Sequence, residues 1–353
     1  MFLFYSNDIF REDLKFALKS SVQYEKLKAC NILITGATGL IGSFLVDALM
    51  LCNELYGYGI NVFAMGRNMK SLQKRFTSHC GNPYFHVLQH DVNMQLTVNY
   101  TFDYIIHAAS NAFPQVFSTD PVGTIMTNIL GCYNLLEFSR KTSVKKFLFI
   151  SSGEVYGQGT DDIEEFDESY SGYVDNTNPR SCYPNAKRTA ETLCVSYTKQ
   201  YNIDTVIARP CHTYGPTATV KDNRVTAQFI NNVIEGKDIV MKSQGLQLRS
   251  YCYVPDCVSG VLTILLNGKT GNAYNIANKN SNVTIREIAE IVSNITGKKI
   301  IFELPNDVEK SGYNLVTKSV LNAKKLEALG WNAKYDIKDG LMRTLKILSQ
   351  IQR

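Results

Sequence analysis

Short apolar runs alternate with amphipathic segments from residue 31 onward. Runs of about five mostly apolar residues predict buried strands, and apolar residues spaced three and four apart predict helices. The predicted strands are 31–35, 61–65, 84–88, 104–109 and 146–151, with predicted helices between them that include 41–51 and 124–141. Strands that alternate with helices form parallel sheets covered on both faces. The pattern therefore predicts an α/β fold with a doubly wound parallel sheet.

The N-terminal residues show a different pattern. Residues 7–28 place apolar side chains at helical spacing behind Asn7, a residue type that caps helix N-termini. The spaced residues are Phe10, Leu14, Ala17 and Leu18. We therefore expect residues 1–29 to form an N-terminal helical arm.

Beyond residue 175, proline-containing loops interrupt the strand–helix alternation. Three further elements are predicted: a buried strand at 274–278 and surface helices at 283–296 and 321–329. We expect a dinucleotide-binding domain over 30–209 and a smaller mixed substrate lobe over 210–353. A strand near 273–279 is expected to return from this lobe to the first sheet.

Composition and charge narrow the function classes. Hydrophobic residues make up 44% of the 353 residues and charged residues 20%, which is typical of a globular protein with a sizeable core. No apolar stretch approaches 18 residues and the N-terminus lacks a signal-peptide pattern, so we expect no membrane association. The 37 basic and 32 acidic residues give a net charge of +5 without a basic stripe, so no nucleic-acid binding is expected.

Cysteine usage indicates a reducing compartment. The nine cysteines are scattered and contain no C-x-x-C pair, which favours free thiols in a cytoplasmic protein. The five histidines are not interleaved with them at ligand spacing, so no metal site is expected.

A glycine-rich turn follows the first predicted strand directly. The segment TGATGLIG places Gly36, Gly39 and Gly42 between an apolar strand and an amphipathic helix. Such glycines allow a tight turn, the approach of a pyrophosphate and close helix–strand packing, and the helix N-terminus attracts the phosphates. We interpret the segment as the dinucleotide loop of a Rossmann domain; an ordinary glycine-rich turn is the alternative.

The second predicted strand lacks the acid that binds the ribose hydroxyls in many NAD-selective folds. It ends AMGRN, where Arg67 can meet an adenosine 2′-phosphate, stack on adenine or lie in solvent. Asp91 and Val92 after the third strand are candidate adenine contacts, although an exposed turn would look the same.

A Y-x-x-x-K motif carries the candidate chemistry. Tyr183 and Lys187 lie four residues apart in a predicted helix, so their side chains share one face. A lysine ammonium favours a neighbouring phenolate, and we expect Lys187 to lower the pKa of Tyr183 so that it can act as a base toward a sugar hydroxyl. Ser151 and Ser152 follow the fifth predicted strand, upstream of the motif.

Together these motifs resemble an extended short-chain dehydrogenase/reductase of the nucleotide-sugar epimerase/dehydratase family, from about residue 31 to the C-terminus. Four segments are most similar to the UDP-glucuronate decarboxylase branch: 120–137, 179–193, 214–230 and 248–260. The resemblance implies a Rossmann domain, a C-terminal nucleotide-sugar lobe, a tightly held nicotinamide cofactor and homodimers made through paired helices.

The resemblance also implies residue roles. Ser152, Tyr183 and Lys187 match the catalytic hydroxyl, the base and its modulator, and Glu154 matches a carboxylate that decarboxylases and 4,6-dehydratases share. The implied substrate-binding residues are Glu154, His212, Arg224 and Arg249. The implied cofactor-binding residues are Gly36, Thr38, Gly39, Leu40, Ile41, Gly42, Arg67, Asp91, Val92, Ala108, Ala109, Ser110, Asn128, Tyr183, Lys187 and Pro210. An exposed strand-end carboxylate is the alternative for Glu154, and a surface ion pair is the alternative for Arg249.

Two further positions depart from the family pattern. Gly153 stands where decarboxylases have Ser and sugar 4,6-dehydratases often have Asp, so no side chain there can protonate a leaving hydroxyl. His212 stands where the family usually has a substrate-binding Asn.

The expected activity is decarboxylation of UDP-glucuronate to UDP-xylose through transient oxidation at C4. The resemblance favours NAD as cofactor, while Arg67 leaves NADP open. A nucleotide-sugar 4,6-dehydratase of the dTDP-glucose type is the first alternative, followed by a 4-epimerase. A cofactor-binding protein without catalysis is a third alternative, which the intact Ser152, Tyr183 and Lys187 set disfavours.

Overall fold

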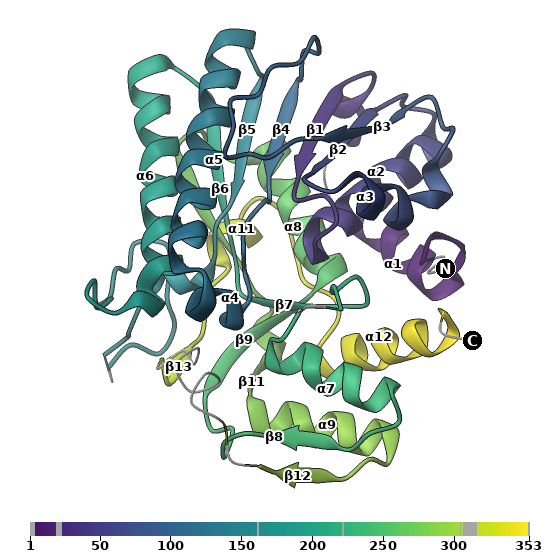
Figure 1. Ribbon diagram of the computed structural model, residues 1–353, viewed down its shortest axis with the longest axis vertical. Coiled ribbons are helices and arrows are strands. Elements are labelled where there is room, and N and C mark those ends of the chain that lie inside the picture. The colour runs from purple at the N-terminus through teal and green to yellow at the C-terminus, as the bar shows by residue number, and fades with distance from the viewer. Residues whose placement is uncertain are drawn as a thin grey trace.

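Seven parallel strands form the main sheet of the computed structural model, which describes residues 4–18, 23–160, 162–220, 222–303, 305 and 316–351 (Figure 1). Their order across the sheet is β10-β6-β5-β4-β1-β2-β3, and every neighbouring pair is parallel. The strands are β1 (Asn31–Thr35), β2 (Asn61–Gly66), β3 (Phe85–Gln89), β4 (Tyr104–His107), β5 (Lys146–Ile150), β6 (Thr205–Pro210) and β10 (Asn272–Ile276). The predicted doubly wound parallel sheet is confirmed.

Helices cover both faces of this sheet, which explains why its strands are continuously apolar. On β1, Ile32 and Ile34 belong to one hydrophobic cluster, whereas Leu33 between them belongs to another on the opposite face. The first cluster packs under α2 (Leu40–Tyr56), α3 (Met69–Arg75) and α8 (Val254–Asn267). The second packs under α5 (Pro121–Thr142) and α6 (Cys182–Tyr201).

A smaller lobe lies below the carboxyl ends of the strands (Figure 1). Its central strand, β9 (Leu248–Tyr253), pairs with β7 (His212–Tyr214), β11 (Asn282–Thr284) and β13 (Lys318–Ser319), while β8 (Ile239–Met241) pairs with β12 (Ile300–Phe302). Its helices are α7 (Val225–Ile234), α9 (Ile285–Thr296) and α12 (Ile337–Ile351), whereas the short helix α11 (Lys324–Glu327) lies against β10 and α8 of the main sheet layer (Figure 1). Short helical elements elsewhere are α4 (Pro114–Thr119), η1 (Phe4–Ser6), η2 (Tyr24–Leu27), η3 (Thr77–His79), η4 (Gly153–Tyr156), η5 (Pro179–Ser181) and η6 (Lys279–Ser281).

The predicted surface helix over 321–329 is wrong in extent and exposure. The structure forms only the single turn α11, and Leu326 within it is fully buried. Leu321 and Ala323 before the turn are also buried, and Leu326 lies against Gly260 of α8. The packing of these apolar side chains against the core determines where the backbone runs. The segment therefore does not form an amphipathic helix longer than the single turn α11.

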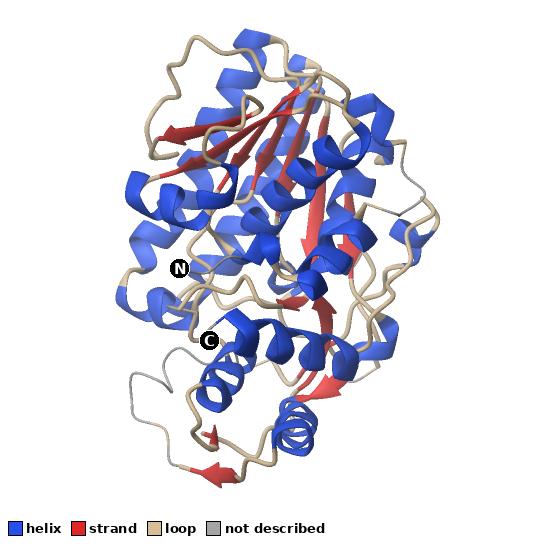
Figure 2. Cartoon of the chain, turned by 90° about the vertical axis from the view of Figure 1, so that its right-hand side faces the viewer, coloured by secondary structure: helices blue, strands red, loops and turns tan. Residues whose placement is uncertain are grey.

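The predicted N-terminal helix is confirmed over a shorter range. Helix α1 (Asp8–Ala17) begins at Asn7, whose side chain accepts a hydrogen bond from the Phe10 amide. The predicted arm also includes residues 1–3 and 19–22, which lie outside the described residues. Helix α1 lies beside α12, the last described helix, and the buried Asp13 carboxylate accepts a hydrogen bond from Arg343 of α12 (Figures 1 and 2).

None of the helices in the described part of the chain combines the length and apolar character needed to cross a membrane. The described cysteines are all free thiols, and Cys80 is the one that is exposed.

Candidate active site

Two adjoining cavities lie between the sheet and the smaller lobe. The first, of about 180 Å³, is lined by the glycine-rich turn, the ends of β5 and β6, and α6. The second, of about 460 Å³, is lined mainly by β7, β9, α7 and the segment before α7. Glu154, His212 and Arg224 line both cavities, so a ligand in one contacts residues that also face the other.

The glycine-rich turn forms one wall of the smaller cavity. Gly36 has a positive φ of 63°, and a Cβ atom there would lie 2.7 Å from the Ala108 carbonyl oxygen. Helix α2 begins after Gly39 without any side-chain cap, which leaves its first backbone N–H groups available to a phosphate. Both features are what a pyrophosphate-binding turn requires.

The end of β4 lies directly against this turn and adds Ala108 and Ser110 to the cavity lining. The Thr35 hydroxyl lies 2.8 Å from His107 Nδ1 and accepts a hydrogen bond from the Ala109 amide, which fixes the ends of β1 and β4 together. Burial, with a smaller effect of Lys187, lowers the pKa of His107 to about 3. His107 is therefore neutral, and it links the ends of β1 and β4 through its contact with Thr35.

The structure brings most of the predicted cofactor-binding residues to the smaller cavity and leaves others outside it. Those that line it are Gly36, Gly39, Leu40, Ile41, Gly42, Ala108, Ser110, Tyr183, Lys187 and Pro210. Those outside its lining are Thr38, Arg67, Asp91, Val92, Ala109 and Asn128. Asn128 is buried and accepts a hydrogen bond from Ser110, so it acts through a cavity residue, whereas Arg67 is exposed at the end of β2.

Tyr183 and Lys187 project from α6 into the smaller cavity. The Lys187 Nζ lies 5.7 Å from the centroid of the Tyr183 ring and donates to the Ile150 carbonyl oxygen at 2.7 Å. The Ser152 hydroxyl lowers the pKa of Tyr183 and accepts a hydrogen bond from the Glu154 amide at 3.1 Å. A phenol, an amine and a hydroxyl therefore meet at the end of β5.

The expected effect of Lys187 on Tyr183 is not what the structure shows. Burial, followed by the charge of Glu154, raises the pKa of Tyr183 to about 12. Burial also lowers the pKa of Lys187 to about 7, which weakens the ammonium that was expected to favour the phenolate. Ionisation of Tyr183 therefore requires additional positive charge near its hydroxyl.

Sequence reasoning missed Arg180, which lies within the segment quoted for the Y-x-x-x-K motif. Its Nη2 donates to both oxygens of the Glu154 carboxylate, at 3.1 and 3.2 Å. Arg180 precedes Tyr183 by three residues, and that helical spacing was the available signal. Phe117, which stacks on Tyr183 with ring centroids 4.7 Å apart, gave no such signal.

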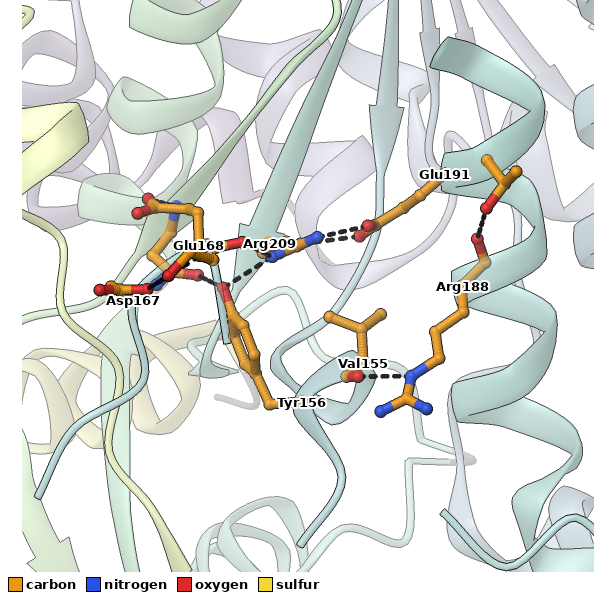
Figure 3. Close-up of polar contacts among 10 residues, drawn as sticks. Val155, Tyr156, Asp167, Glu168, Arg188, Glu191 and Arg209 are labelled. Atoms are coloured by element: carbon orange, nitrogen blue, oxygen red, sulfur yellow. Dashed lines mark hydrogen bonds and ion pairs between the residues drawn. The ribbon is translucent and has the colours of Figure 1, made fainter. Parts of the chain in front are cut away.

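A buried polar network holds η4, the turn that carries Glu154. Figure 3 shows Arg209 between the Glu191 carboxylate and the Tyr156 hydroxyl, at 2.6 and 2.9 Å. Arg188 of α6 donates to the Val155 carbonyl oxygen at 2.7 Å. The helix that carries Tyr183 and Lys187 therefore also fixes the turn that carries Glu154.

The larger cavity is rich in cationic side chains. Arg249 is buried, its Nη1 donates to His212 Nε2 at 2.8 Å, and its Nε has no hydrogen-bond partner among the described residues. Burial, together with Arg249 and Arg224, lowers the pKa of His212 well below its ordinary value, so its imidazole is neutral. Arg224 is paired with Asp222, which leaves Arg249 as the cation without a carboxylate partner in this cavity, within the part of the chain described.

Gly153 occupies a packed position rather than an open one. A Cβ atom at this residue would lie 3.1 Å from Leu321 Cδ2, which is closer than ordinary van der Waals contact. The absent side chain therefore makes room for Leu321 of the smaller lobe.

Comparison with known proteins agrees with this geometry. UDP-glucuronic acid decarboxylase 6 of Arabidopsis thaliana is 34% identical over 314 residues, which cover 88% of this chain and 86% of the relative. UDP-glucuronic acid decarboxylase 1 of Danio rerio is 30% identical over 320 residues, covering 90% of this chain and 72% of the relative.

Solved structures share the fold at lower identity. A dTDP-glucose 4,6-dehydratase from Streptomyces venezuelae with NAD bound has a TM-score of 0.79 at 22% identity, covering 91% of this chain and 97% of its own. A UDP-glucuronic acid 4-epimerase from Bacillus cereus, in complex with UDP-glucuronic acid and NAD, has a TM-score of 0.76 at 24% identity, covering 91% and 99%.

The sequence match to a family covers both the glycine-rich turn and the Y-x-x-x-K helix. It extends over residues 32–277, from β1 to the end of the main sheet at β10, and so includes every strand that lines the smaller cavity's sheet side. With this match and relatives above 30% identity, the chain belongs to the NAD dependent epimerase/dehydratase family.

Proposed function

We propose that this protein decarboxylates UDP-glucuronate to UDP-xylose by transient oxidation at C4 of the sugar. The observation that carries the proposal is the buried Arg249, which lines the same cavity as Glu154 and has no carboxylate partner within the described residues. A buried guanidinium without a carboxylate partner favours an anionic ligand such as a sugar carboxylate or a diphosphate. The identity to UDP-glucuronic acid decarboxylases over most of the chain supports the same substrate.

The smaller cavity fits NAD by its own geometry. A Cβ atom at Gly36 or Gly42 would collide with backbone, at 2.7 Å and 2.5 Å respectively, so only glycine permits this turn against the uncapped start of α2. Ser151 Oγ, at the end of β5, is buried in the cavity lining and lacks a hydrogen-bond partner within the described residues. Gly36, Gly39 and the first turn of α2 would hold the pyrophosphate, and Tyr183 and Lys187 would lie at the other end of the cofactor.

When bound, NAD supplies the hydride acceptor for C4, and its positively charged nicotinamide favours the phenolate of a neighbouring tyrosine. Tyr183 would accept the proton of the C4 hydroxyl, assisted by Ser152, which lowers the pKa of this phenol. Lys187, held against the Ile150 carbonyl, keeps a second donor near the Tyr183 ring.

Oxidation at C4 makes the C6 carboxylate part of a β-keto acid, which loses carbon dioxide and leaves an enolate at C4–C5. Ser152 and Tyr183 are placed to donate hydrogen bonds to the O4 oxyanion, and such oriented donors stabilise developing charge. Glu154 and Arg249 line the cavity that would take the C5–C6 region. A proton from water would then add at C5, and return of the hydride to C4 together with the Tyr183 proton to O4 would give the pentose nucleotide and restore the phenolate.

Epimerisation at C4 is the second candidate, and Gly153 is the observation that favours it. This residue offers no hydroxyl beside Glu154, whereas Tyr183, Lys187 and Ser152 suffice for reversing a C4 hydroxyl. A 4,6-dehydration is disfavoured for the same reason, because no side chain at residue 153 can protonate the leaving hydroxyl.

The products of a panel of nucleotide sugars, weighed by mass spectrometry, test the proposal. Loss of carbon dioxide from UDP-glucuronate supports decarboxylation, loss of water from a UDP- or dTDP-hexose supports dehydration, and unchanged mass with altered stereochemistry supports epimerisation. No product from any member of the panel, with NAD added, would contradict the enzymatic assignment.

We also propose a homodimer formed through α5 and α6 in a cytoplasmic enzyme. These two helices carry exposed large apolar side chains: Val122, Met126 and Tyr133 on α5, and Val195 and Tyr201 on α6. Apolar side chains gathered on one surface are typical of subunit interfaces. Sedimentation equilibrium of the full chain tests the dimer.

A further inference from the structure

Arg180 lies between two groups of the proposed mechanism. Its guanidinium bonds both carboxylate oxygens of Glu154 and lies 4.6 Å from the centroid of the Phe117 ring. Phe117 in turn stacks on Tyr183, with ring centroids 4.7 Å apart and planes 23° apart. The cation therefore neighbours the carboxylate directly and the phenol across one aromatic ring.

Local structure fixes the backbone of Arg180. The short turn η5 begins with Pro179, and the Asn178 side chain accepts a hydrogen bond from the Arg180 amide at 2.9 Å. The turn continues directly into α6 at Cys182, one residue before Tyr183. Because η5 and α6 are continuous, the positions of Arg180 and Tyr183 are set together.

The Glu154–Arg180 pair is shielded from water. The side chains retain 20% and 13% of their accessible surface, and both line the larger cavity. Ion pairs at such sites are screened less than surface pairs, and each partner left alone is costly. Removal of either residue should therefore shift the pKa values of ionisable groups nearby.

The two residues act on Tyr183 in opposite directions. The charge of Glu154 raises the pKa of Tyr183, after burial, whereas Arg180 lowers it. Ser152 and Arg224 also lower the pKa of this phenol, and Lys187 Nζ of the same helix lies 5.7 Å from the centroid of its ring. Arg180 thus compensates for a carboxylate that the proposed chemistry needs close to its base.

We propose that Arg180 is a positioning residue that holds the Glu154 carboxylate toward the sugar cavity and offsets its charge at the Tyr183 hydroxyl. The inference rests on the proposed function only in its first step, oxidation at C4 with Tyr183 as the base. That step is common to decarboxylation, dehydration and epimerisation.

The test is the pH dependence of C4 oxidation, measured as single-turnover reduction of bound NAD by whichever nucleotide sugar proves to be a substrate. The rate rises with pH as Tyr183 ionises. Arg180→Gln should move this rise to higher pH by about one unit, the shift that a unit charge produces over roughly 10 Å at an effective dielectric constant of about 20. Glu154→Gln should move it to lower pH by a similar amount, and the double variant should lie between them.

Two further variants separate positioning from folding. Arg180→Lys keeps the charge, so its pH profile should stay close to that of the unmodified protein even where its maximal rate falls. Arg188→Gln removes a neighbouring guanidinium that supports the same turn through backbone carbonyl oxygens. It should lower the unfolding temperature and move the profile less than Arg180→Gln does, because Arg188 is not among the charges that act on Tyr183.

An unmoved profile in Arg180→Gln, or a shift in the same direction as Glu154→Gln, would overturn the inference. If Arg180→Gln does not fold, Arg180→Lys and Glu154→Gln decide it: a large shift in the first or none in the second contradicts the proposal. A substrate that turns out to be epimerised or dehydrated would refute the proposed decarboxylation and leave this test intact.

Discussion

Replacing Gly36 by Ala tests whether the turn after β1 is built for a pyrophosphate, and Gly57 provides a matched control. Both glycines have a φ of 63°. A Cβ atom at Gly57, the residue that ends α2, would meet nothing within 4 Å. A Cβ atom at Gly36 would lie 2.7 Å from the Ala108 oxygen and 2.8 Å from Ala109 Cα. The two variants therefore share the backbone strain and differ in the collision.

The expected magnitudes follow from this difference. An alanine in the left-handed region costs about 1–2 kcal/mol, partly offset by about 0.4–1 kcal/mol from the restricted unfolded chain, so Gly57→Ala should lose about 1 kcal/mol. Gly36→Ala adds an overpacking cost of about 1–3 kcal/mol, because the atoms in the way are backbone and cannot rotate aside. Its total loss should be about 2–4 kcal/mol, with the turn displaced from the cavity.

Urea unfolding of both variants, with and without NAD, measures the two effects. NAD at a hundred times its dissociation constant should stabilise the unmodified protein and Gly57→Ala by about 2.7 kcal/mol. Gly36→Ala should lose most of that increment, and calorimetry should show weakened binding. Equal losses in the two variants, or unchanged NAD affinity in Gly36→Ala, would refute the assignment of this turn to the cofactor.

Three other predictions address the base, the carboxylate and the fold. Tyr183→Phe should lower turnover by roughly 10²–10⁴-fold while calorimetry shows NAD binding retained, because the phenol moves a proton and does not hold phosphates; near-normal turnover would exclude it as the base. Glu154→Gln should slow release of carbon dioxide more than reduction of bound NAD, so that a 4-keto sugar accumulates in rapid-quench mass spectra; equal rates would make Glu154 a bystander. Burial raises the pKa of Asp256 to about 7. The folded protein therefore keeps a proton that the unfolded chain loses near pH 4. The free energy of unfolding should fall by about 4 kcal/mol through this group as pH rises from about 4 to 7. Both Asp256 oxygens accept backbone N–H groups, so Asp256→Asn loses one acceptor and should be less stable at pH 4, and this deficit should shrink as pH rises from 5 to 8 in urea unfolding; parallel pH curves for the two proteins would contradict this.

The strands of the main sheet could be predicted from sequence because a strand that is buried on both faces appears as a short run of consecutive apolar residues. β1 is predicted and observed over the same five residues, 31–35, and β2 and β5 differ from their predictions by one residue at an end. Such runs stay apolar whichever way each side chain points. Segment 321–329 has no comparable sequence pattern, since its backbone conformation depends on how it packs against α8.

The site could be predicted only as far as residues that are close in sequence. The glycine-rich turn and the Y-x-x-x-K spacing identify their own neighbourhoods, and the structure places both at one cavity. Glu154 pairs with Arg180 and His212 with Arg249, across 26 and 37 residues of chain. No periodicity reports such pairs: Glu154 and Arg180 lie in separate short turns, η4 and η5, and His212 and Arg249 lie on the paired strands β7 and β9.

The direction of the Tyr183 shift could not be predicted for the same reason. Its neighbour in sequence, Lys187, favours ionisation, whereas the effects that dominate are burial and a carboxylate from another segment. A motif records which groups are present, and the pKa depends on how deeply the fold encloses them. The pKa of Tyr183 is therefore set by residues that the motif does not include.

Gly153 shows how packing between the lobes can change a site while its chemistry remains in place. Leu321 is buried in the hydrophobic core that spans both lobes, and a Cβ atom at residue 153 would stand 3.1 and 3.3 Å from its two methyl groups. The missing side chain at residue 153 and the bulk of Leu321 therefore fit each other in one packing contact. Glu154, the next residue, keeps its place because its carboxylate is held by Arg180 and its turn by Arg188, neither of which depends on residue 153. The glycine at residue 153 removes the hydroxyl that decarboxylases carry there. Its contact with Leu321 fixes the distance between the end of β5, which carries Ser152, and the smaller lobe, which carries Arg249.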